Sequence, residues 1–497
     1  MISAITGFLL VRALSSGPRG WCRHDFLRLL LGAGLGVGLS SCCYFLGLLS
    51  QIPGAFLELL LLVGAGVGAF LRRKNAKCPL CQTPAAPRND RLLTSALAMV
   101  FFVLLMLDGG AFIGAVSRAP NGQWDAWAIW NMRARFLYRD GGAVWRDGFT
   151  ELMNWSHPDY PLLVPAFVAS VWRTLGRETR TVPIALSAFF SFGSAGLMAT
   201  SVSILRGARQ GYLAGLVLAA TPALYLQGAS QYADVPLAFF VLATLVTATL
   251  ADRHDSIGFS VLAGTMATLA GWTKNEGLQW FGCFFLAWLI VNRSRRMAAF
   301  LAGAAPVLAV ILLFKTQVAT SSDIVGTSGR IGMMRRLLDI SRYELIIREG
   351  LVHVWNFGPL VLSPFVILAV FLAVVGVRPD ARDRRALQIC CLALALTIPG
   401  YFMVYVLRSL DLAWLLRTSL NRLILQIWPG IVFAVFLAAR TAERHSIGAS
   451  PLVRALSEAP QTNTPGPGLA FSPGTVLESQ PFPSLHAPRI TLNPGSR

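Results

Sequence analysis

Long apolar segments of about twenty residues recur along the chain, separated by short polar stretches. An apolar helix of about 20 residues is the element that crosses the ~30 Å hydrocarbon core of a bilayer. Charged residues make up only 13% of the sequence, and apolar residues 55%, whereas ordinary soluble domains carry about 25% charged residues. A soluble fold of 497 residues could not cover so much apolar surface. We therefore expect an all-α polytopic membrane protein.

The apolar segments predict about twelve membrane-spanning helices. Residues 1–13 are short for a span, so they form either an interfacial helix or a thirteenth span. Two further segments are also short, which predicts that residues 273–277 between them enter the protein at membrane depth and line a cavity. The expected spans are 26–49, 52–71, 92–115, 182–205, 211–229, 234–251, 258–272, 277–292, 297–315, 358–377, 387–407 and 421–439.

The basic residues indicate how the chain is oriented. Lys and Arg outnumber Asp and Glu by 43 to 24, a net charge of +19. In a soluble protein this excess would indicate nucleic acid, but no basic helix or stacking platform accompanies it, so we expect no nucleic-acid partner. Segments rich in Lys and Arg between spans stay cytoplasmic. Four such segments fall on one face of the membrane when the spans are counted: 72–77, 206–209, 293–296 and 378–385.

The orientation and the composition together give a location and three regions. We expect a multi-pass protein of the inner or plasma membrane, with its long loops 116–181 and 316–357 on the extracytoplasmic face. The regions are 1–91, with N-terminal membrane helices and a basic cytoplasmic loop; 92–440, the main membrane region; and 441–497, a Pro-, Ser- and Gly-rich tail that we expect to be disordered and cytoplasmic.

Cysteine spacing points to no metal site. Cys78 and Cys81 form a single Cys-x-x-Cys pair in the first basic loop. A structural zinc ion needs four ligands, and no second pair lies nearby. We expect a reduced cytoplasmic loop at this position.

Unusual polar residues begin in the first outer loop. Aromatic and arginine residues interleave at helical spacing over 124–141, which predicts an amphipathic helix at the membrane interface. Asp125 stands at its start, where a carboxylate can also be a simple helix cap. His157 and Asp159 precede an apolar stretch that is too short to span. We expect that stretch to lie along the membrane surface, and a proline-rich helix start is the structural alternative for this motif.

Three further motifs put charges at the outer ends of predicted spans. Asp234 begins one span and could serve only as a helix cap. Lys274 and Glu276 lie between two short apolar helices, where ionisable residues face a cavity or each other. Arg417 and Arg422 stand at the mouth of the last span, where arginine side chains also extend to the interface without further function.

The order of these motifs resembles the GT-C class of membrane glycosyltransferases. The run "WDAWAIWNMRARFLY … HPDYPLLVPAF … QYADVPLAFF … WTKNEG … TSLNRLILQIWP" is similar to the Rgt-type branch, which is related to protein mannosyltransferases and to the aminoarabinose transferases of lipid A. The similarity covers about residues 92–440. Members of the class take a sugar from a polyprenyl-phosphate carrier and place it on an acceptor at the extracytoplasmic face.

The resemblance implies a fold and a set of site residues. It implies a GT-C-like bundle of about 12–13 transmembrane helices with interfacial helices in the first large outer loop. It puts the family's acidic residue at Asp125 and further family motifs at His157, Asp159 and Asp234. The acidic pair often found at the first position is absent, since Ala126 follows Asp125.

The expected reaction displaces a lipid phosphate from the anomeric carbon by a hydroxyl of a glycan, lipid or protein acceptor. A carboxylate can take the hydroxyl proton: Asp125 is the first candidate, Asp159 the second and Asp108 the third. Cations stabilise the leaving phosphate, and they could replace a divalent metal, so we expect no cofactor and no metal. The substrate-binding candidates are His157, Asp234, Lys274, Glu276, Arg417 and Arg422, with the arginines of 133–139 as alternates for the cations.

A multi-pass transporter or lipid flippase is the alternative function. It too would carry ions within the membrane, but it favours inverted repeats and broken helices, and the sequence shows no repeat. A purely structural membrane protein would not explain acidic, basic and histidine residues on one face. Convergence of Asp125, Asp159, Asp234 and Lys274 on one outer cavity would favour the transferase.

Overall fold

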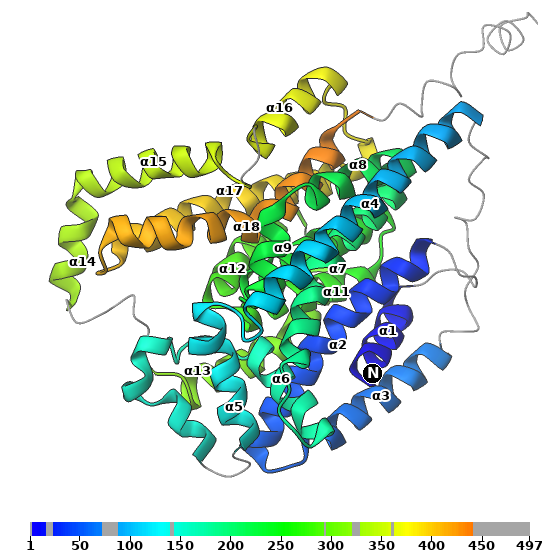
Figure 1. Cartoon of the computed structure of the whole chain (residues 1–497). Helices are drawn as coiled ribbons and strands as arrows, with labels where there is room; N and C mark the ends of the chain where they lie inside the picture. The colour runs from blue at the N-terminus through cyan, green and yellow to red at the C-terminus, as the bar shows by residue number, and fades with distance from the viewer. Residues whose placement is uncertain are drawn as a thin grey trace, which may run out of the picture. The chain divides into compact units, whose positions relative to one another are not determined.

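The computed structural model describes residues 2–15, 23–71, 88–139, 144–292, 295–320, 329–358 and 362–440. This part of the chain is almost wholly helical (Figure 1), and residues Met1–Glu443 belong to one compact unit. Eight of its helices are long and apolar enough to cross a membrane. The expected all-α polytopic membrane protein is confirmed. The predicted Cys-x-x-Cys loop at Cys78 and Cys81 and the tail 441–497 lie outside the described residues.

The long helices follow the apolar segments of the sequence closely. In hydrocarbon every backbone N–H and C=O group must be satisfied within the protein, so each apolar segment continues as helix. Three of the long helices even continue through an internal proline, at Pro306, Pro399 and Pro429. The long helices are α2 (Arg23–Ser50), α3 (Gly54–Leu71), α4 (Arg88–Arg118), α7 (Thr181–Arg206), α10 (Asp234–Arg253), α13 (Arg295–Gln317), α17 (Arg384–Leu407) and α18 (Leu412–Ala438).

The remaining predicted spans are shorter or broken. The segment 211–229 is a pair of helices bent by 54°, because Pro222 starts the second one and has no N–H to continue the first. The predicted span 358–377 is too long: the described helix there begins at Pro364 and has 12 residues. These shorter helices are α1 (Ile2–Leu14), α8 (Ala208–Ala219), α9 (Pro222–Ala229), α11 (Ile257–Thr273), α12 (Asn275–Val291) and α16 (Pro364–Val375).

The start of the last long helix differs from the prediction. Helix α18 begins at Leu412 rather than at residue 421, because the Asp411 side chain accepts a hydrogen bond of 2.6 Å from the Trp414 backbone N–H. This is an N-cap, which satisfies one of the unpaired donors at a helix start. Arg422 therefore lies well inside a helix instead of at its mouth.

Helix α10 lies at the centre of the unit. It is apolar on all sides, as expected of a helix that is buried all round, and it contacts α7, α11, α17 and α18. Beside it α11 and α13 approach closely through two glycines. A Cβ on Gly264 would lie 2.0 Å from the Phe300 carbonyl oxygen, and one on Gly303 would lie 2.0 Å from that of Val261. Small residues permit this close packing of membrane helices.

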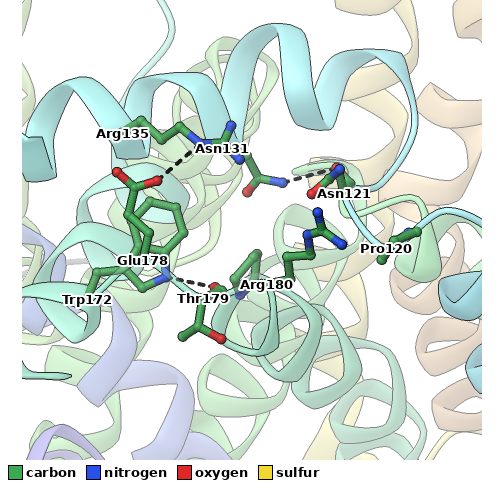
Figure 2. A pocket seen from close by; sticks show the side chains of 9 residues that line it. Pro120, Asn121, Asn131, Arg135, Trp172, Glu178, Thr179 and Arg180 are labelled. Atoms are coloured by element: carbon green, nitrogen blue, oxygen red, sulfur yellow. Dashed lines mark hydrogen bonds and ion pairs between the residues drawn. The ribbon is translucent and has the colours of Figure 1, made fainter. Parts of the chain in front are cut away.

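The first long loop folds into short helices against the bundle. Helix α6 packs on α2 and α5, so protein covers its apolar face. The loop is tied to neighbouring segments by Asn131, whose Nδ2 donates to the Asn121 carbonyl at 3.3 Å (Figure 2). Its helices are η2 (Ala126–Trp130), α5 (Asn131–Arg139), η3 (Val144–Phe149), η4 (Glu151–Ser156) and α6 (Leu163–Leu175). Residues 316–357 contain α14 (Gly329–Leu338) and α15 (Ile340–Trp355).

Candidate functional site

The junction between α11 and α12 buries a lysine. Lys274 is extended, with φ −161° and ψ 159°, so it ends one helix and starts the next. Gly277 lets the two helices meet, because a Cβ there would lie 1.8 Å from the Ala270 carbonyl oxygen. Lys274 is only 3% exposed. The predicted inward course of residues 273–277 is therefore found in the structure.

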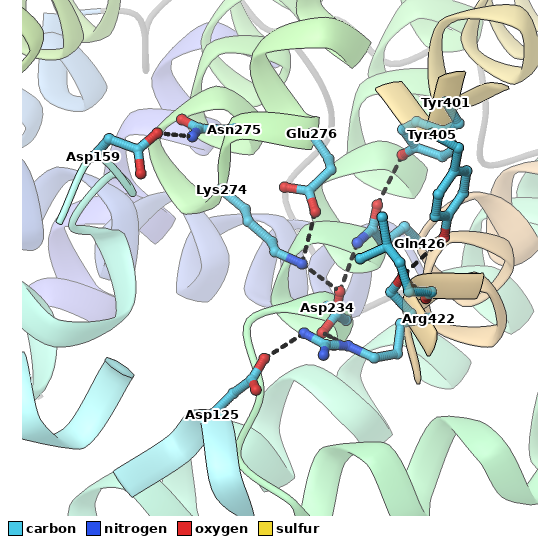
Figure 3. Close-up of polar contacts among 12 residues, drawn as sticks. Asp125, Asp159, Asp234, Lys274, Asn275, Glu276, Tyr401, Tyr405, Arg422 and Gln426 are labelled. Atoms are coloured by element: carbon cyan, nitrogen blue, oxygen red, sulfur yellow. Dashed lines mark hydrogen bonds and ion pairs between the residues drawn. The ribbon is translucent and has the colours of Figure 1, made fainter. Parts of the chain in front are cut away.

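Asp234 is the centre of a network of side chains from three helices and the α11–α12 junction (Figure 3). Its Oδ1 accepts hydrogen bonds from Lys274 Nζ at 3.0 Å and from Gln426 Nε2 at 2.6 Å. Its Oδ2 accepts one from Arg422 Nε at 3.0 Å. The carboxylate is fully buried, and the N-cap of α10 is Ala233 without a side-chain bond. Asp234 therefore gathers two cations and is no helix cap.

Arg422 connects this centre to the first long loop. Its Nη2 donates to Asp125 Oδ2 at 2.6 Å, and its guanidinium lies 4.7 Å from the centre of the Tyr232 ring. Asp125 precedes η2 but makes no capping hydrogen bond with its side chain. The capping alternative for Asp125 is therefore wrong, and its described partner is an arginine from the far end of the sequence.

Lys274 has two carboxylate partners. Its Nζ lies 2.8 Å from Glu276 Oε1 and 3.0 Å from Asp234 Oδ1. The prediction that Lys274 and Glu276 pair is correct but incomplete, since Asp234 shares the same ammonium group. We call Asp125, Asp234, Lys274, Glu276 and Arg422 the ion-pair network. It holds three carboxylates and two cations.

Asp159 lies next to this network without joining it directly. Its Oδ2 accepts a hydrogen bond of 2.6 Å from Asn275, the neighbour of Lys274 in sequence. Lys315 from α13 donates to Asn275 Oδ1 at 2.8 Å and to the Asp159 carbonyl at 2.5 Å. The two candidate bases therefore have different partners in the site: Asp125 pairs with Arg422, and Asp159 accepts from Asn275.

His157 belongs to an aromatic stack. Its ring stacks on Tyr160 at 5.0 Å, and Tyr160 stacks on Trp130 at 5.6 Å. Lys274 Nζ lies 5.8 Å from the centre of the Tyr160 ring. Tyr160 therefore lies in contact with both His157 and Lys274. The role of His157 in substrate binding stays a prediction.

The helix predicted over 124–141 faces inward at Arg133. This guanidinium is fully buried, donates to the Ser156 carbonyl at 2.5 Å, and has two nitrogens without a partner among the described residues. Burial lowers the pKa of Arg133 to about 9, so the group is still charged at neutral pH. For Arg133 the interfacial interpretation is wrong, because this side chain packs against Phe149 inside the protein, whereas Arg135 and Arg139 remain partly exposed.

The two arginines of the last motif separate. Arg417 is exposed, and no ion pair of the described residues includes it. Five residues in a helix correspond to about 140° around its axis, so Arg417 and Arg422 cannot face the same neighbour. Asp108, the third candidate base, lies in α4 and belongs neither to the ion-pair network nor to the contacts of Asp159 with Asn275 and Lys315.

Sequence reasoning missed several members of the site. Gln426 lies four residues after Arg422, on the same face of α18, and Tyr401 of α17 donates to its Oε1 at 2.8 Å. Gln426 lay inside the predicted span 421–439, and its spacing of four residues from Arg422 was the signal that could have found it. Asn275 could have been included from the sequence, because it lies between Lys274 and Glu276 in the motif WTKNEG. No sequence pattern indicates that Lys315 meets Asp159.

No family model, no curated protein and no solved structure matches this chain. The resemblance to GT-C glycosyltransferases therefore rests on the sequence motifs and their order alone. Among the described residues, no three or more His, Cys, Asp or Glu side chains are grouped so that they could hold a metal ion. The expected absence of a metal stays a prediction.

Proposed function

We propose that the protein is an integral membrane glycosyltransferase. It would move a sugar from a polyprenyl-phosphate donor to a hydroxyl of a glycan, lipid or protein acceptor on the extracytoplasmic face. The observation that carries the proposal is the ion-pair network, in which the buried Asp234 holds the buried Lys274 and the half-buried Arg422 beside the carboxylate of Asp125. Buried charges are costly unless paired, and a well-packed apolar replacement is often as stable. A function is the simplest reason to keep them.

The cations of the network are suited to a phosphate leaving group. A fixed cation lowers the barrier most where negative charge develops in the transition state. Lys274 and Arg422 are both held by Asp234, which positions them without being exposed itself. A guanidinium can bind a phosphate through two parallel hydrogen bonds. We therefore assign the donor phosphate to Arg422 and Lys274, and a positioning role to Asp234.

Asp125 is the proposed base. A donor phosphate that binds Arg422 competes with the 2.6 Å contact between Arg422 and Asp125. The carboxylate released in this way can take the proton of the acceptor hydroxyl as the new O–C bond forms at the anomeric carbon. The bond from that carbon to the phosphate oxygen breaks, and the phosphate leaves on its lipid carrier. Asp159 remains the second candidate.

The test is a membrane assay with radiolabelled polyprenyl-phosphate sugars. The purified chain is placed in liposomes with each donor and with membrane extracts as acceptor source. We expect one donor to be consumed and its label to appear on an acceptor. A transporter or flippase would move a lipid-linked sugar across the bilayer with its phosphate bond intact. Translocation without cleavage would overturn the proposal.

A further inference from the structure

A separate pocket of about 160 Å³ lies where the end of α4, helix α5 and the start of α7 meet (Figure 2). It is smaller than the ~300–1,000 Å³ sites that hold drug-sized ligands, so it suits a single sugar ring. Of the residues predicted from the sequence as catalytic or substrate-binding, only Arg135 lines it, and the sequence offered Arg135 as an alternate for the cations. The residues that matter here are Asn121, Asn131, Arg135, Trp172, Glu178 and Arg180.

The walls of the pocket suit hydroxyl groups. The side chains of Asn121 and Asn131 each carry an acceptor oxygen and two donor hydrogens. Trp172 contributes an aromatic wall, held in place because its Nε1 donates to the Thr179 carbonyl at 2.9 Å. Mixed amide and aromatic linings hold ligands that carry both polar and apolar groups. A sugar ring, with hydroxyls on its edge and C–H groups on its face, is such a ligand.

The charge of the pocket is positive. Glu178 lies 3.4 Å from Arg135 and also accepts two hydrogen bonds from Arg139, so one carboxylate serves two guanidinium groups. Arg180 has no ion-pair partner among the described residues, and its side chain reaches across the pocket towards Asn121 (Figure 2). Unneutralised guanidinium groups favour a ligand with a carboxylate or a phosphate.

The pocket shares two segments with the ion-pair network. Asn131 Nδ2 donates to Gln231 Oε1 at 2.9 Å, and Gln231 lies three residues before Asp234. Asn131 also follows Asp125 by six residues along one helical run, which is about 9 Å at 1.5 Å per residue. The pocket and the network are therefore joined through Asn131 and Gln231, although Asp125 itself does not line the pocket.

We propose that this pocket binds an acidic sugar, a hexose carrying a carboxylate or a phosphate, and that this sugar belongs to the acceptor. The assignment to the acceptor rests on the proposed function, whereas the binding itself does not. Arg180 is the residue that selects the acidic group. The neutral part of the sugar contacts Asn121, Asn131 and Trp172.

The experiment measures binding with no donor present. Saturation-transfer NMR is recorded on the full chain in phosphatidylcholine nanodiscs, with D-glucuronate, glucose 6-phosphate and D-glucose as separate probes. We expect an acidic probe to bind more tightly than glucose, and the two acidic probes distinguish carboxylate from phosphate. Loss of a charge-assisted hydrogen bond in Arg180→Gln should raise the Kd of that probe about tenfold or more. Arg177→Gln, at an exposed arginine outside the pocket, is the matched control and should leave it unchanged.

Three outcomes overturn the inference. They are equal binding of all three probes, no binding of any, and an equal loss in Arg177→Gln and Arg180→Gln. A failed transferase assay with intact, Arg180-dependent binding would overturn the proposed function alone. A working transferase without such binding would overturn this pocket alone.

Discussion

The two ends of α10 carry ion pairs of different kinds. At the end that begins with Asp234, side chains pair with side chains, and the central carboxylate is shared by Lys274 and Arg422. At the end that finishes with Arg253, charged side chains also bind the backbone: Arg253 donates to the Leu205 carbonyl at 2.7 Å, and Arg206 donates to the Ala439 carbonyl. We call these the Asp234 end and the Arg253 end.

The carbonyls bound at the Arg253 end lie at helix termini. The last carbonyls of a helix lack partners within it, and basic side chains satisfy them. Asp380 similarly caps a short helix through the Arg382 backbone N–H at 3.1 Å. These contacts hold helix ends together and have a structural explanation.

The Asp234 end has no comparable explanation. Its ion pairs satisfy no helix terminus, since neither Asp125 nor Asp234 makes a capping bond with its side chain. The comparison teaches that ion pairs of similar burial can have different roles. Partners on the backbone indicate architecture, and a network of side chains alone indicates a site. Four predictions test this difference.

The largest effect is expected from Asp125→Asn. The change keeps the size of the side chain and removes its basicity, so turnover should fall by about 10²–10⁴ with the donor still bound. Steady-state transfer rates and donor binding check it. Asp383→Asn, at a buried carboxylate of the Arg253 end, is the control and should leave the turnover of folded protein unchanged. Near-normal turnover of Asp125→Asn would contradict its role as the base and make Asp159 the first candidate for that role.

The next effect concerns Lys274. Lys274→Met combined with Glu276→Gln removes one cation and one carboxylate, and Asp234 keeps Arg422 and Gln426 as partners. The double variant should therefore fold. Without the cation its turnover should fall by about 10²–10³, as for the loss of one transition-state donor. Monodispersity on size exclusion and the transfer rate are the measurements. A folded and fully active double variant would mean that Arg422 alone binds the donor phosphate.

At the Arg253 end, a substitution should lower the stability of the protein and leave its activity unchanged. Arg253→Gln leaves the buried Asp383 with a weaker partner, because Arg253 Nη1 lies 3.5 Å from its Oδ2. Unsatisfied buried groups cost about 1–3 kcal/mol, so the apparent Tm should fall while turnover per folded molecule stays constant. Thermal unfolding and transfer rates on the same preparation check this. A selective loss of turnover would contradict the division between the two ends.

The smallest effect lies in the first long loop, away from both ends. The hydrogen bond from Arg139 lowers the pKa of Glu178 below its ordinary value. Its contribution to stability is therefore present above the unfolded pKa of about 4.3 and is lost as pH falls through the folded value. Exposed pairs are worth roughly 0–1 kcal/mol. Thermal unfolding of Glu178→Gln should differ slightly from wild type at pH 7, and the difference should vanish at low pH; a difference that grows on acidification would contradict it.

The site could be predicted only in part. Asp125, Asp234, Lys274 and Arg422 were all expected from the sequence, and the structure brings them together. Arg417 was expected with them, but the rotation of α18 turns it away. A motif locates a residue along the chain, whereas the phase of the helix decides which neighbour it meets.

What the sequence alone determined is the class of fold and the course of most helices. Apolar segments of about 20 residues become helices in hydrocarbon because no water is present to satisfy the backbone. Only the tertiary structure decided which charges meet. Asp234 contacts Arg422 across 188 positions of sequence, and Arg422 contacts Asp125 across 297. Such pairs depend on how helices cross and rotate, and that is settled by the packing of side chains distant in sequence.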